Sequence, residues 1–424
     1  MTDRIARNLA LFKPHSLFIG VDLGSSLHAA IVLDEGRQRL ARFSFPATRE
    51  GFEQLAKRRL DLIRKYSAGD AIVGMEPSGG HWMLLAADLE QREVPYVLVN
   101  PYTVRVYRQS VSLDRSKDDF RDAYSIADLV RIGNFTRTRL QHGDYAELRE
   151  LTHCYGQLRD EIARAKNTLR STLMRVFPEL NHLLPDVDTL IARSILHTCA
   201  VASAIHQMTL EEFTDRVRAA YQGHIFPLLR LRNIYLAAQT SIGLQEGTTT
   251  AQMTLNQTMQ LIDLLTAQQQ EVQQRLETIF LRTPEARPML SLPGLGPCTA
   301  ARILGEIGDP RHFDTGKQLV KLAGLQPTPN TSGNKTQSKT PISRQGRAGL
   351  RTTLYFVTLR LLQHDVAFRK RYLYLQQRPV NPLTKMQAIA ALMAKLLRVL
   401  WALMYHQTTY APSQASVLMP VLTS

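Results

Sequence analysis

The sequence predicts a chain of three parts: an α/β domain, a coiled-coil connector with an inserted helical segment, and a mainly α C-terminal domain, over residues 1–140, 141–285 and 286–424. Two patterns predict this order. Short apolar runs alternate with stretches of helical spacing in the first part, and apolar residues recur in alternating steps of three and four in the second. The length of 424 residues also favours two or three domains, because single cores rarely grow beyond roughly 250–300 residues.

The first part is expected to hold a mixed sheet covered by helices on both faces. Three consecutive apolar runs are predicted to form hairpin strands, at residues 17–22, 29–33 and 40–45. Helix and strand patterns then alternate, with helices expected over 50–65, 81–92 and 119–132 and strands over 71–76 and 96–100. Thr48 is a suitable N-cap for the first of these helices. Hairpin strands followed by helix–strand units are typical of a mixed sheet.

The middle part carries two heptad seams. The first extends over residues 146–176, about four heptads, and the second over 255–279. The two helices could pair within one chain as an antiparallel hairpin or join another protomer, and ordinary bundle helices would give the same pattern in either run alone. Residues 178–252 between them are mostly helical by pattern and indicate no chemistry.

The charge of the chain favours a polyanionic partner. Lys and Arg number 52 against 37 Asp and Glu, which gives a formal net charge of +15. Each Lys or Arg that meets a phosphate releases condensed counterions, so such an excess suits nucleic acid. A basic protein without such a partner would show the same composition.

Cysteine usage and hydropathy exclude other classes. Cys154, Cys199 and Cys298 lie far apart without a CxxC spacing, which supports neither a disulfide framework nor a zinc site. No stretch of about 18 uninterrupted apolar residues occurs, so a cytoplasmic protein without membrane contact is expected.

Four acidic residues stand where their carboxylates can converge. Asp22 and Glu76 each end a buried apolar run, where a merely solvated acid has no special reason to stand. Asp119 and Asp122 are three apart in the first turn of a predicted helix and share one face, although acids in a first turn also commonly interact with the helix dipole. Four such carboxylates would repel one another without a cation, and hard divalent ions prefer oxygen ligands.

These residues resemble the N-terminal domain of the DEDD transposases, the insertion-sequence one-ten family that includes the pilin-gene invertases. The resemblance rests on the strand-end Asp22 and Glu76 and on the Lys-x-Asp-x-x-Asp-Ala run that begins at Lys117. It implies a RuvC-like fold, itself an RNase H-like sheet, in which the four carboxylates bind Mg²⁺, or Mn²⁺ in its place. Asp118 occupies a slot that is usually Thr or Asn, and Lys117 matches the basic residue that opens the motif and would contact nucleic acid.

The C-terminal part contains an ordered series of turn motifs. Gly294 and Gly296 lie in a Pro-Gly-Leu-Gly-Pro turn that resembles a helix-hairpin-helix turn, where backbone amides accept a phosphate, although any glycine-rich helix start looks similar. No acid lies between Asn330 and Arg360, a stretch that suits phosphate binding better than a solvated surface of mixed sign. Its basic residues are Lys335, Lys339, Arg344, Arg347, Arg351 and Arg360, and the first five are expected to grip nucleic acid.

The motifs follow in the order of a Pro-Gly-x-Gly turn at 293–296, an Ala-Gly-Leu-x-Pro turn at 323–327, a Ser-Gly pair at 332–333, an Ile-Ser-x-x-Gly basic run at 342–346 and Leu-Arg at 350–351. This order resembles the second domain of the same family, in which the serine of the Ser-Gly pair is the nucleophile that bonds covalently to DNA. By position that serine is Ser332, with Ser343 as the main competitor and Thr331 and Ser338 as further candidates. No histidine lies close in sequence, so a metal held by the four acids could activate the hydroxyl if the two domains meet. Without the resemblance, Ser332 reads as an ordinary turn residue beside Gly333.

The resemblance implies a bacterial recombinase that cleaves, exchanges and rejoins strands of donor and target DNA, in the cytoplasm and at the nucleoid when it acts. It also implies a structured bridge RNA as guide. The coiled-coil seams and the need to handle four DNA ends imply a homodimer or homotetramer. The resemblance covers residues 17–133 and 290–406, and the segment 178–252 matches no motif.

Three other functions stay open. A junction-resolving RNase H-like nuclease would use metal-activated water in place of serine. An actin-like sugar kinase would share residues 21–26, Val-Asp-Leu-Gly-Ser-Ser, as a phosphate loop, but no later glycine-rich adenosine motif is present and the basic run would be unexplained. A non-catalytic DNA- or RNA-binding protein would tolerate neutralisation of all four acids.

Overall fold

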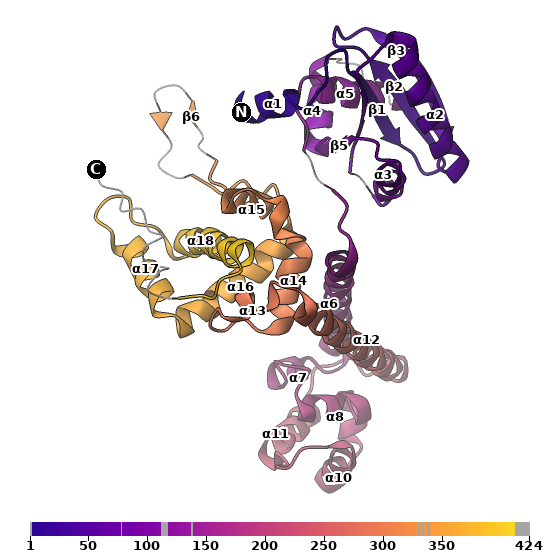
Figure 1. Cartoon of the computed structure of the whole chain (residues 1–424). Helices are drawn as coiled ribbons and strands as arrows, with labels where there is room; N and C mark the ends of the chain where they lie inside the picture. The colour runs from indigo at the N-terminus through magenta and orange to yellow at the C-terminus, as the bar shows by residue number, and fades with distance from the viewer. Residues whose placement is uncertain are drawn as a thin grey trace. The chain divides into compact units, whose positions relative to one another are not determined.

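The computed structural model describes residues 2–77, 79–111, 118–136, 139–328, 331–332, 335–336 and 340–411 (Figure 1). The chain forms two compact units, residues 1–140 and 141–424. The first is an α/β unit and the second is mainly helical, as the sequence predicts. The separation of a connector from a C-terminal domain within the second unit stays a prediction.

The first unit is built on a five-stranded mixed sheet of order β3-β2-β1-β4-β5. β1 and β2 pair antiparallel, as do β2 and β3, whereas β4 pairs parallel with both β1 and β5. This is the strand order of an RNase H-like sheet. The strands are β1 (Leu17–Leu23), β2 (Leu27–Leu33), β3 (Arg39–Pro46), β4 (Ala71–Met75) and β5 (Tyr96–Leu98).

Helices cover both faces of this sheet, as predicted. Alternate residues of β1 separate the two cores: Ile19 packs with α2 and α3, whereas Phe18 packs with α4 and α5. The Thr48 hydroxyl caps α2 by accepting from the Gly51 amide at 3.3 Å. The helices of this unit are α1 (Thr2–Leu9), α2 (Arg49–Tyr66), α3 (His81–Gln91), α4 (Pro101–Val111) and α5 (Asp119–Arg131).

The absence of a side chain at Gly20 lets α5 lie directly on β1. A Cβ at this position would fall 2.0 Å from the Ala123 carbonyl oxygen and 2.4 Å from the Ala127 amide nitrogen. Because those atoms belong to the helix backbone, no rotamer change could relieve the overlap. Gly20 therefore fixes the distance of α5 from the strand that carries Asp22.

Two long helices, α6 (Gly143–Val176) and α12 (Thr248–Arg282), lie side by side in the second unit. They are antiparallel, because Arg282 at the end of α12 pairs with Asp144 at the start of α6 at 2.8 Å. Supercoiling of the pair stays a prediction. Five short helices follow α6 in the chain and precede α12. Together with the end of α6 and the start of α12 they enclose a separate core (Figure 1). They are α7 (Pro178–Leu183), α8 (Leu190–Thr198), α9 (Ala202–His206), α10 (Leu210–Ala220) and α11 (Leu228–Gln239).

The remaining helices pack on the other half of the α6–α12 pair around a second core, to which Leu148 and Leu276 contribute. Two short paired strands, β6 (Thr331–Ser332) and β7 (Lys335–Thr336), project from them. The helices are α13 (Ala286–Leu290), α14 (Pro297–Ile307), the 3₁₀ turn η1 (Pro310–His312), α15 (Gly316–Leu322), α16 (Ala348–His364), α17 (Val366–Gln377) and α18 (Lys385–His406).

Within the described part of the chain, α18 is the one helix that is long and apolar enough to cross a membrane. Lys395 and Arg398 interrupt its apolar sequence. Of its most apolar window, 61% is buried inside the helical unit, where residues such as Leu396 and Leu400 belong to the core. The helix therefore has the burial of a core helix.

Candidate functional site

Asp22 and Glu76 reach the same edge of the sheet. Asp22 is the penultimate residue of β1, and Glu76 directly follows β4. The two strands are parallel and Val21 lies opposite Met75, so the next residue of each strand, Asp22 or Glu76, stands at the same level. Parallel pairing of β1 with β4 thus brings together two acids that are far apart in the sequence.

The start of α5 supplies the other two acids. Asp119 and Asp122 lie in its first turn, as the sequence predicts. Asp118, the doubtful candidate, is the N-cap: its carboxylate accepts a hydrogen bond from the Phe120 amide at 3.0 Å. Because that carboxylate satisfies the helix end, the structure gives Asp118 a local role in α5.

The other acids of the cluster are close enough to Asp22 and Glu76 to raise the pKa of those two carboxyl groups. Burial, followed by repulsion from Asp122, Asp119 and Glu76, raises the pKa of Asp22 to about 6. Burial raises the pKa of Glu76 as well, and Asp122 adds to the rise while Arg108 opposes it. The repulsion predicted from the sequence is therefore present.

Arg108 is the charged partner that the sequence analysis did not identify. Its Nη1 atom donates to Oδ1 and Oδ2 of Asp122 at 2.9 and 3.0 Å. It reaches the cluster from α4, a helix absent from the sequence predictions. No local pattern marks Arg108, because its pairing with Asp122 depends on how α4 packs against α5.

The donor set of the cluster consists of carboxylate oxygens, which are the ligands that Mg²⁺ and Mn²⁺ prefer. Among the residues that the structure describes, no three His, Cys, Asp or Glu side chains are drawn together closely enough to hold an ion. Asp122 is instead paired with Arg108. The cluster fits a hard divalent cation by its chemistry and would have to close around it.

The predicted nucleophile lies in the β6–β7 hairpin. Ser332 is the second residue of β6 and pairs with Lys335 of β7, and Thr331 pairs with Thr336. Three predicted residues, Lys117, Ser338 and Lys339, lie outside the described residues. The main competitor is placed in the fold by its backbone, because the Ser343 amide donates to the Gln326 carbonyl at 2.9 Å.

Two arginines of the basic run are engaged within the helical unit. The Arg347 guanidinium donates to the Glu306 carbonyl oxygen, and Arg351 donates to the Ala323 carbonyl oxygen at 2.9 Å. Burial, with repulsion from Arg149, lowers the pKa of Arg347 to about 10. Both side chains tie the start of α16 to the ends of other helices, Arg347 to α14 and Arg351 to α15. Their predicted contact with nucleic acid is untested.

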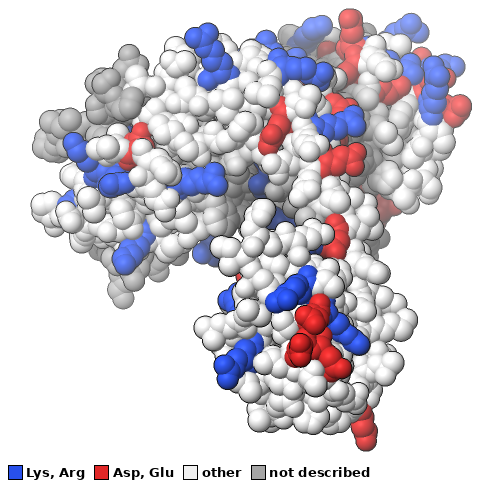
Figure 2. Space-filling view, turned by 90° about the horizontal axis from the view of Figure 1, so that it is seen from below, with Lys and Arg blue, Asp and Glu red and all other residues white. Residues whose placement is uncertain are grey.

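Arg344 stands apart from those two arginines. Its backbone is in the left-handed region, with φ 54°, and its amide donates to the Gly324 carbonyl at 3.0 Å. On the face drawn in Figure 2, basic side chains are scattered singly and in small groups, with acidic ones among them. The net positive charge does not form one broad patch on that face.

The turn before α14 has the backbone that its glycines predict. Gly294 has φ 76°, which a residue with a side chain rarely adopts, and Gly296 is the N-cap of α14. A Cβ at Gly294 would lie 3.7 Å from the Cβ of Arg360. The turn therefore passes beside α16.

Comparison with known families assigns both units. Residues 19–178 match a family model described as a transposase, and residues 286–373 match one described as the transposase IS116/IS110/IS902 family. The chain belongs to the IS110 family of transposases. The matches span the carboxylate cluster in one unit and the turn motifs in the other, so the family resemblance drawn from those residues is confirmed.

Two relatives of this transposase match most of its length, and a third matches a shorter part. The mini-circle protein for IS117 of Streptomyces coelicolor is 25% identical over 76% of this chain and 78% of its own. A 43.6 kDa protein of insertion element IS110 from the same organism is 24% identical over 93% of this chain and 95% of its own. The pilin gene-inverting protein of Moraxella bovis is 32% identical over 28% of this chain and 38% of its own.

Among solved structures, the transposase is similar to a Thermus thermophilus RuvC structure, with 14% identity and a TM-score of 0.22. The alignment covers 28% of the transposase and 98% of that chain. A score of this size assigns no fold by itself. The assignment of an RNase H-like sheet rests on the strand order and pairing of the first unit.

Proposed function

We propose that this transposase cleaves, exchanges and rejoins DNA strands through a covalent serine–DNA intermediate, with Ser332 as the nucleophile. Asp22, Glu76, Asp119 and Asp122 would hold Mg²⁺, or Mn²⁺ in its place. The observation that carries the proposal is the convergence of the four acids: Asp22 and Glu76 end neighbouring parallel strands, and α5, which bears Asp119 and Asp122, packs directly on β1. Burial and the three other carboxylates raise the pKa of Asp22 to about 6. Strongly shifted acids of this kind cluster at functional sites.

The proposed reaction exchanges one phosphoester bond for another. The Ser332 oxygen bonds to a DNA phosphorus, one phosphorus–oxygen bond of the backbone breaks, and the serine proton passes to the departing oxygen through a base or solvent. A hydroxyl of the second strand then attacks the same phosphorus and releases serine. When bound, the metal would stabilise charge that develops on the phosphate oxygens. The four carboxylates would hold the metal ion at the sheet edge.

The proposal includes the partners that the family resemblance and the coiled-coil seams imply. These are donor and target DNA, a structured bridge RNA, and further copies of the chain in a homodimer or homotetramer, acting in the cytoplasm at the nucleoid. The net charge of +15 supports polyanionic partners. The antiparallel helices α6 and α12 would form the coiled-coil connector.

The experiment that tests the proposal traps the covalent intermediate on a DNA substrate that carries the element's ends. We expect mass spectrometry of the digested adduct to find DNA linked to the peptide that contains Ser332. Ser332→Ala should abolish the adduct and leave DNA binding nearly intact, whereas Ser343→Ala should weaken binding and still form adduct. DNA linked to Ser343 would identify Ser343, in place of Ser332, as the nucleophile.

A nuclease that uses water is distinguished by the same samples. It would cleave DNA in the presence of Mg²⁺ without any linked peptide, and Ser332→Ala would cleave as well as the wild type. Asp119→Asn serves as the negative control, because it should abolish cleavage by either the serine or the water mechanism. Absence of cleavage and of adduct in the wild type, together with unchanged DNA binding by Asp119→Asn and Asp122→Asn, would favour a binding protein without catalysis.

A further inference from the structure

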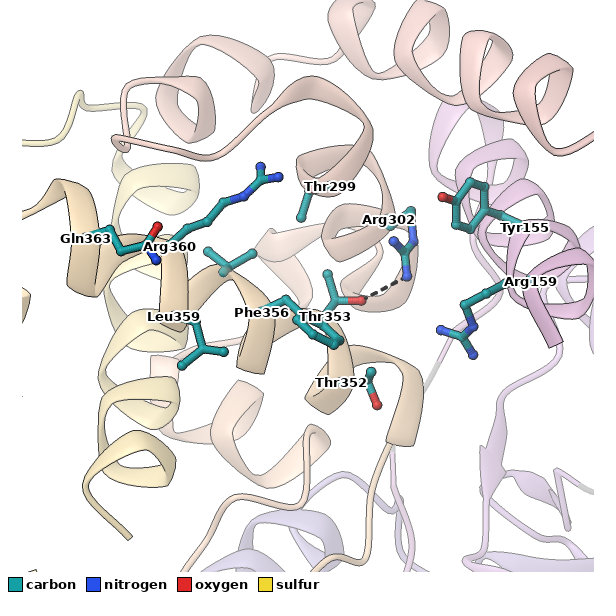
Figure 3. A pocket seen from close by; sticks show the side chains of 11 residues that line it. Tyr155, Arg159, Thr299, Arg302, Thr352, Thr353, Phe356, Leu359, Arg360 and Gln363 are labelled. Carbon is teal, nitrogen blue, oxygen red and sulfur yellow. Dashed lines mark hydrogen bonds between the residues drawn. The ribbon is translucent and has the colours of Figure 1, made fainter. Parts of the chain in front are cut away.

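A pocket of about 410 Å³ lies between three helices of the second unit, α6, α14 and α16 (Figure 3). Its volume is within the range of sites that hold small molecules and single nucleotides. The residues that carry the argument are Tyr155, Arg159, Arg302, Thr353, Phe356 and Arg360. Arg360 is the last residue of the basic run, and the other five belong neither to the carboxylate cluster nor to the motifs from which nucleic-acid contacts are predicted.

The pocket is positively charged without an acid to offset it. Arg159, Arg302 and Arg360 all line it, and no Asp or Glu is among the described residues of its wall. Arg159 pairs with its neighbour Asp160 at 2.8 Å, outside the wall. Three arginines in one concave site favour an anionic ligand, because a guanidinium matches the oxygens of a phosphate in both charge and geometry.

Neutral groups hold Arg302 in place. Its Nη2 atom donates to the Thr353 hydroxyl at 3.2 Å, and its guanidinium carbon lies 4.6 Å from the centre of the Tyr155 ring. Figure 3 shows Thr299 between Arg302 and Arg360, with Tyr155 and Arg159 facing them from α6. Because neither contact of Arg302 neutralises its charge, the side chain is positioned and still available to an anion.

An exposed aromatic ring lies beside these arginines. Phe356 lines the same pocket and is 61% exposed, although its helix contributes three leucines and a valine to the core. A planar apolar ring next to phosphate-binding groups suits a base that is not paired, since every base can stack on an aromatic face. A duplex offers no free base face to it.

We propose that this pocket binds an unpaired nucleotide of a single strand, with its phosphate at Arg302 and Arg360 and its base against Phe356. The proposal rests on the proposed function only in that the chain acts on nucleic acid. It adds a binding site at the end of the basic run that follows Asn330, apart from the five basic residues of that run that are expected to grip nucleic acid. An unpaired strand of DNA and a single-stranded part of an RNA share the chemistry that the pocket recognises.

The test measures fluorescence anisotropy of labelled oligothymidine and oligouridine of about 12 nucleotides, and of a DNA duplex, with the full chain. Phe356→Ala and Arg360→Gln should each weaken single-strand binding at least about fivefold, and Arg360→Gln should flatten the salt dependence by about 0.7. Duplex binding should change little. A larger effect on DNA or on RNA identifies the strand that the pocket holds, and equal effects identify shared recognition.

Matched controls lie on neighbouring surfaces. Arg164→Gln removes an exposed arginine from α6, and Tyr374→Ala removes an exposed aromatic ring from α17, both outside the pocket. We expect both to bind single strands like the wild type. Wild-type affinity of Phe356→Ala and Arg360→Gln would overturn the proposal, as would an equal loss of duplex binding.

Thermal unfolding of each variant shows whether it is folded. Arg302→Gln removes the charge of the third residue that carries the proposal, and Arg302→Lys, which retains the charge, takes its place if Arg302→Gln does not fold. The covalent adduct at Ser332 is measured separately. A missing adduct with intact pocket binding would reject the proposed recombination chemistry alone, whereas an intact adduct with unchanged single-strand affinity would reject the pocket alone.

Discussion

Arg108 donates from one nitrogen to both carboxylate oxygens of Asp122, at 2.9 and 3.0 Å. The pair joins α4 to the first turn of α5 and puts a positive charge beside the proposed metal ligands. A divalent cation that binds Asp122 must therefore compete with Arg108 or share the carboxylate with it. The free protein carries its own counter-ion at this site.

We expect Arg108→Gln to tighten Mg²⁺ binding about fivefold, because it removes a competing positive charge that is partly screened by solvent. Isothermal titration calorimetry of the full chain measures the affinity. Arg105→Gln, on the same helix but stacked on Tyr102, should bind Mg²⁺ like the wild type. Weaker binding by Arg108→Gln would show that the arginine supports the metal site.

Mg²⁺ should raise the stability of the transposase, because the ion relieves carboxylate repulsion in the native state only. At a concentration of about 100 times the dissociation constant, the gain is roughly 2.7 kcal/mol. The double variant Asp119→Asn/Asp122→Asn should show no such gain in thermal unfolding. Asp215→Asn, an exposed acid of α10, is the control. Equal responses in the wild type and the double variant would remove the metal-site assignment.

Without metal, the contribution of Asp22 to stability should fall as the pH rises from about 4 to 6. The folded protein holds the Asp22 proton up to a pKa of about 6, above the ordinary value of 3.8, so it binds more protons than the unfolded chain within this window. The loss is on the order of 1 kcal/mol once solvent screening is allowed for. Denaturant titrations in EDTA should show the slope in the wild type, and Asp22→Asn should flatten it. A wild-type stability that rises through this window relative to that of Asp22→Asn would contradict the raised pKa of Asp22.

The contact between Tyr145 and Glu285 should stabilise the helical unit. The Tyr145 hydroxyl donates to both Glu285 oxygens, at 2.9 and 3.0 Å, and Glu285 is only 2% exposed. Tyr145→Phe leaves that buried carboxylate without this donor, so we expect a loss of about 1–3 kcal/mol in the free energy of unfolding. Adding Glu285→Gln should recover part of the loss. Independent, additive effects of the two changes would show that the contact contributes nothing.

Arg344 and Arg347 should separate binding from folding. Arg347→Gln breaks the bond to the Glu306 carbonyl oxygen and should lower stability by about 1–3 kcal/mol. Arg344→Gln should leave stability unchanged and flatten the salt dependence of DNA binding by about one. Denaturation and salt-dependent binding of the two variants provide the comparison. Loss of stability in both variants would show that Arg344, like Arg347, has a structural role.

The positions of the four acids could be predicted because local patterns define them. Asp22 and Glu76 end apolar strands, and Asp119 and Asp122 open an amphipathic helix, so the sheet edge where they meet follows once β1 and β4 are parallel neighbours. Gly20 shows what a pattern cannot reveal, since its role depends on a helix about a hundred residues further along the chain.

Contacts between elements could not be predicted. Arg108 lies in a helix rich in β-branched and aromatic residues, which gave no helical signal, and its partner is set by packing. The pocket likewise combines Tyr155, Arg302 and Arg360 from three helices. The order of these three helices along the chain does not predict which of their faces pack together.

The close approach at Gly20 has a consequence for how loss of function would arise in this transposase. One added methyl group there must push α5 away from β1, and α5 carries two of the four carboxylates while β1 carries a third. A genetic screen for inactive elements should therefore recover substitutions at a residue that touches neither DNA nor metal. Such mutants would accumulate as folded protein, since a shift of one helix spares the sheet, and they would fail only when the acids must act together.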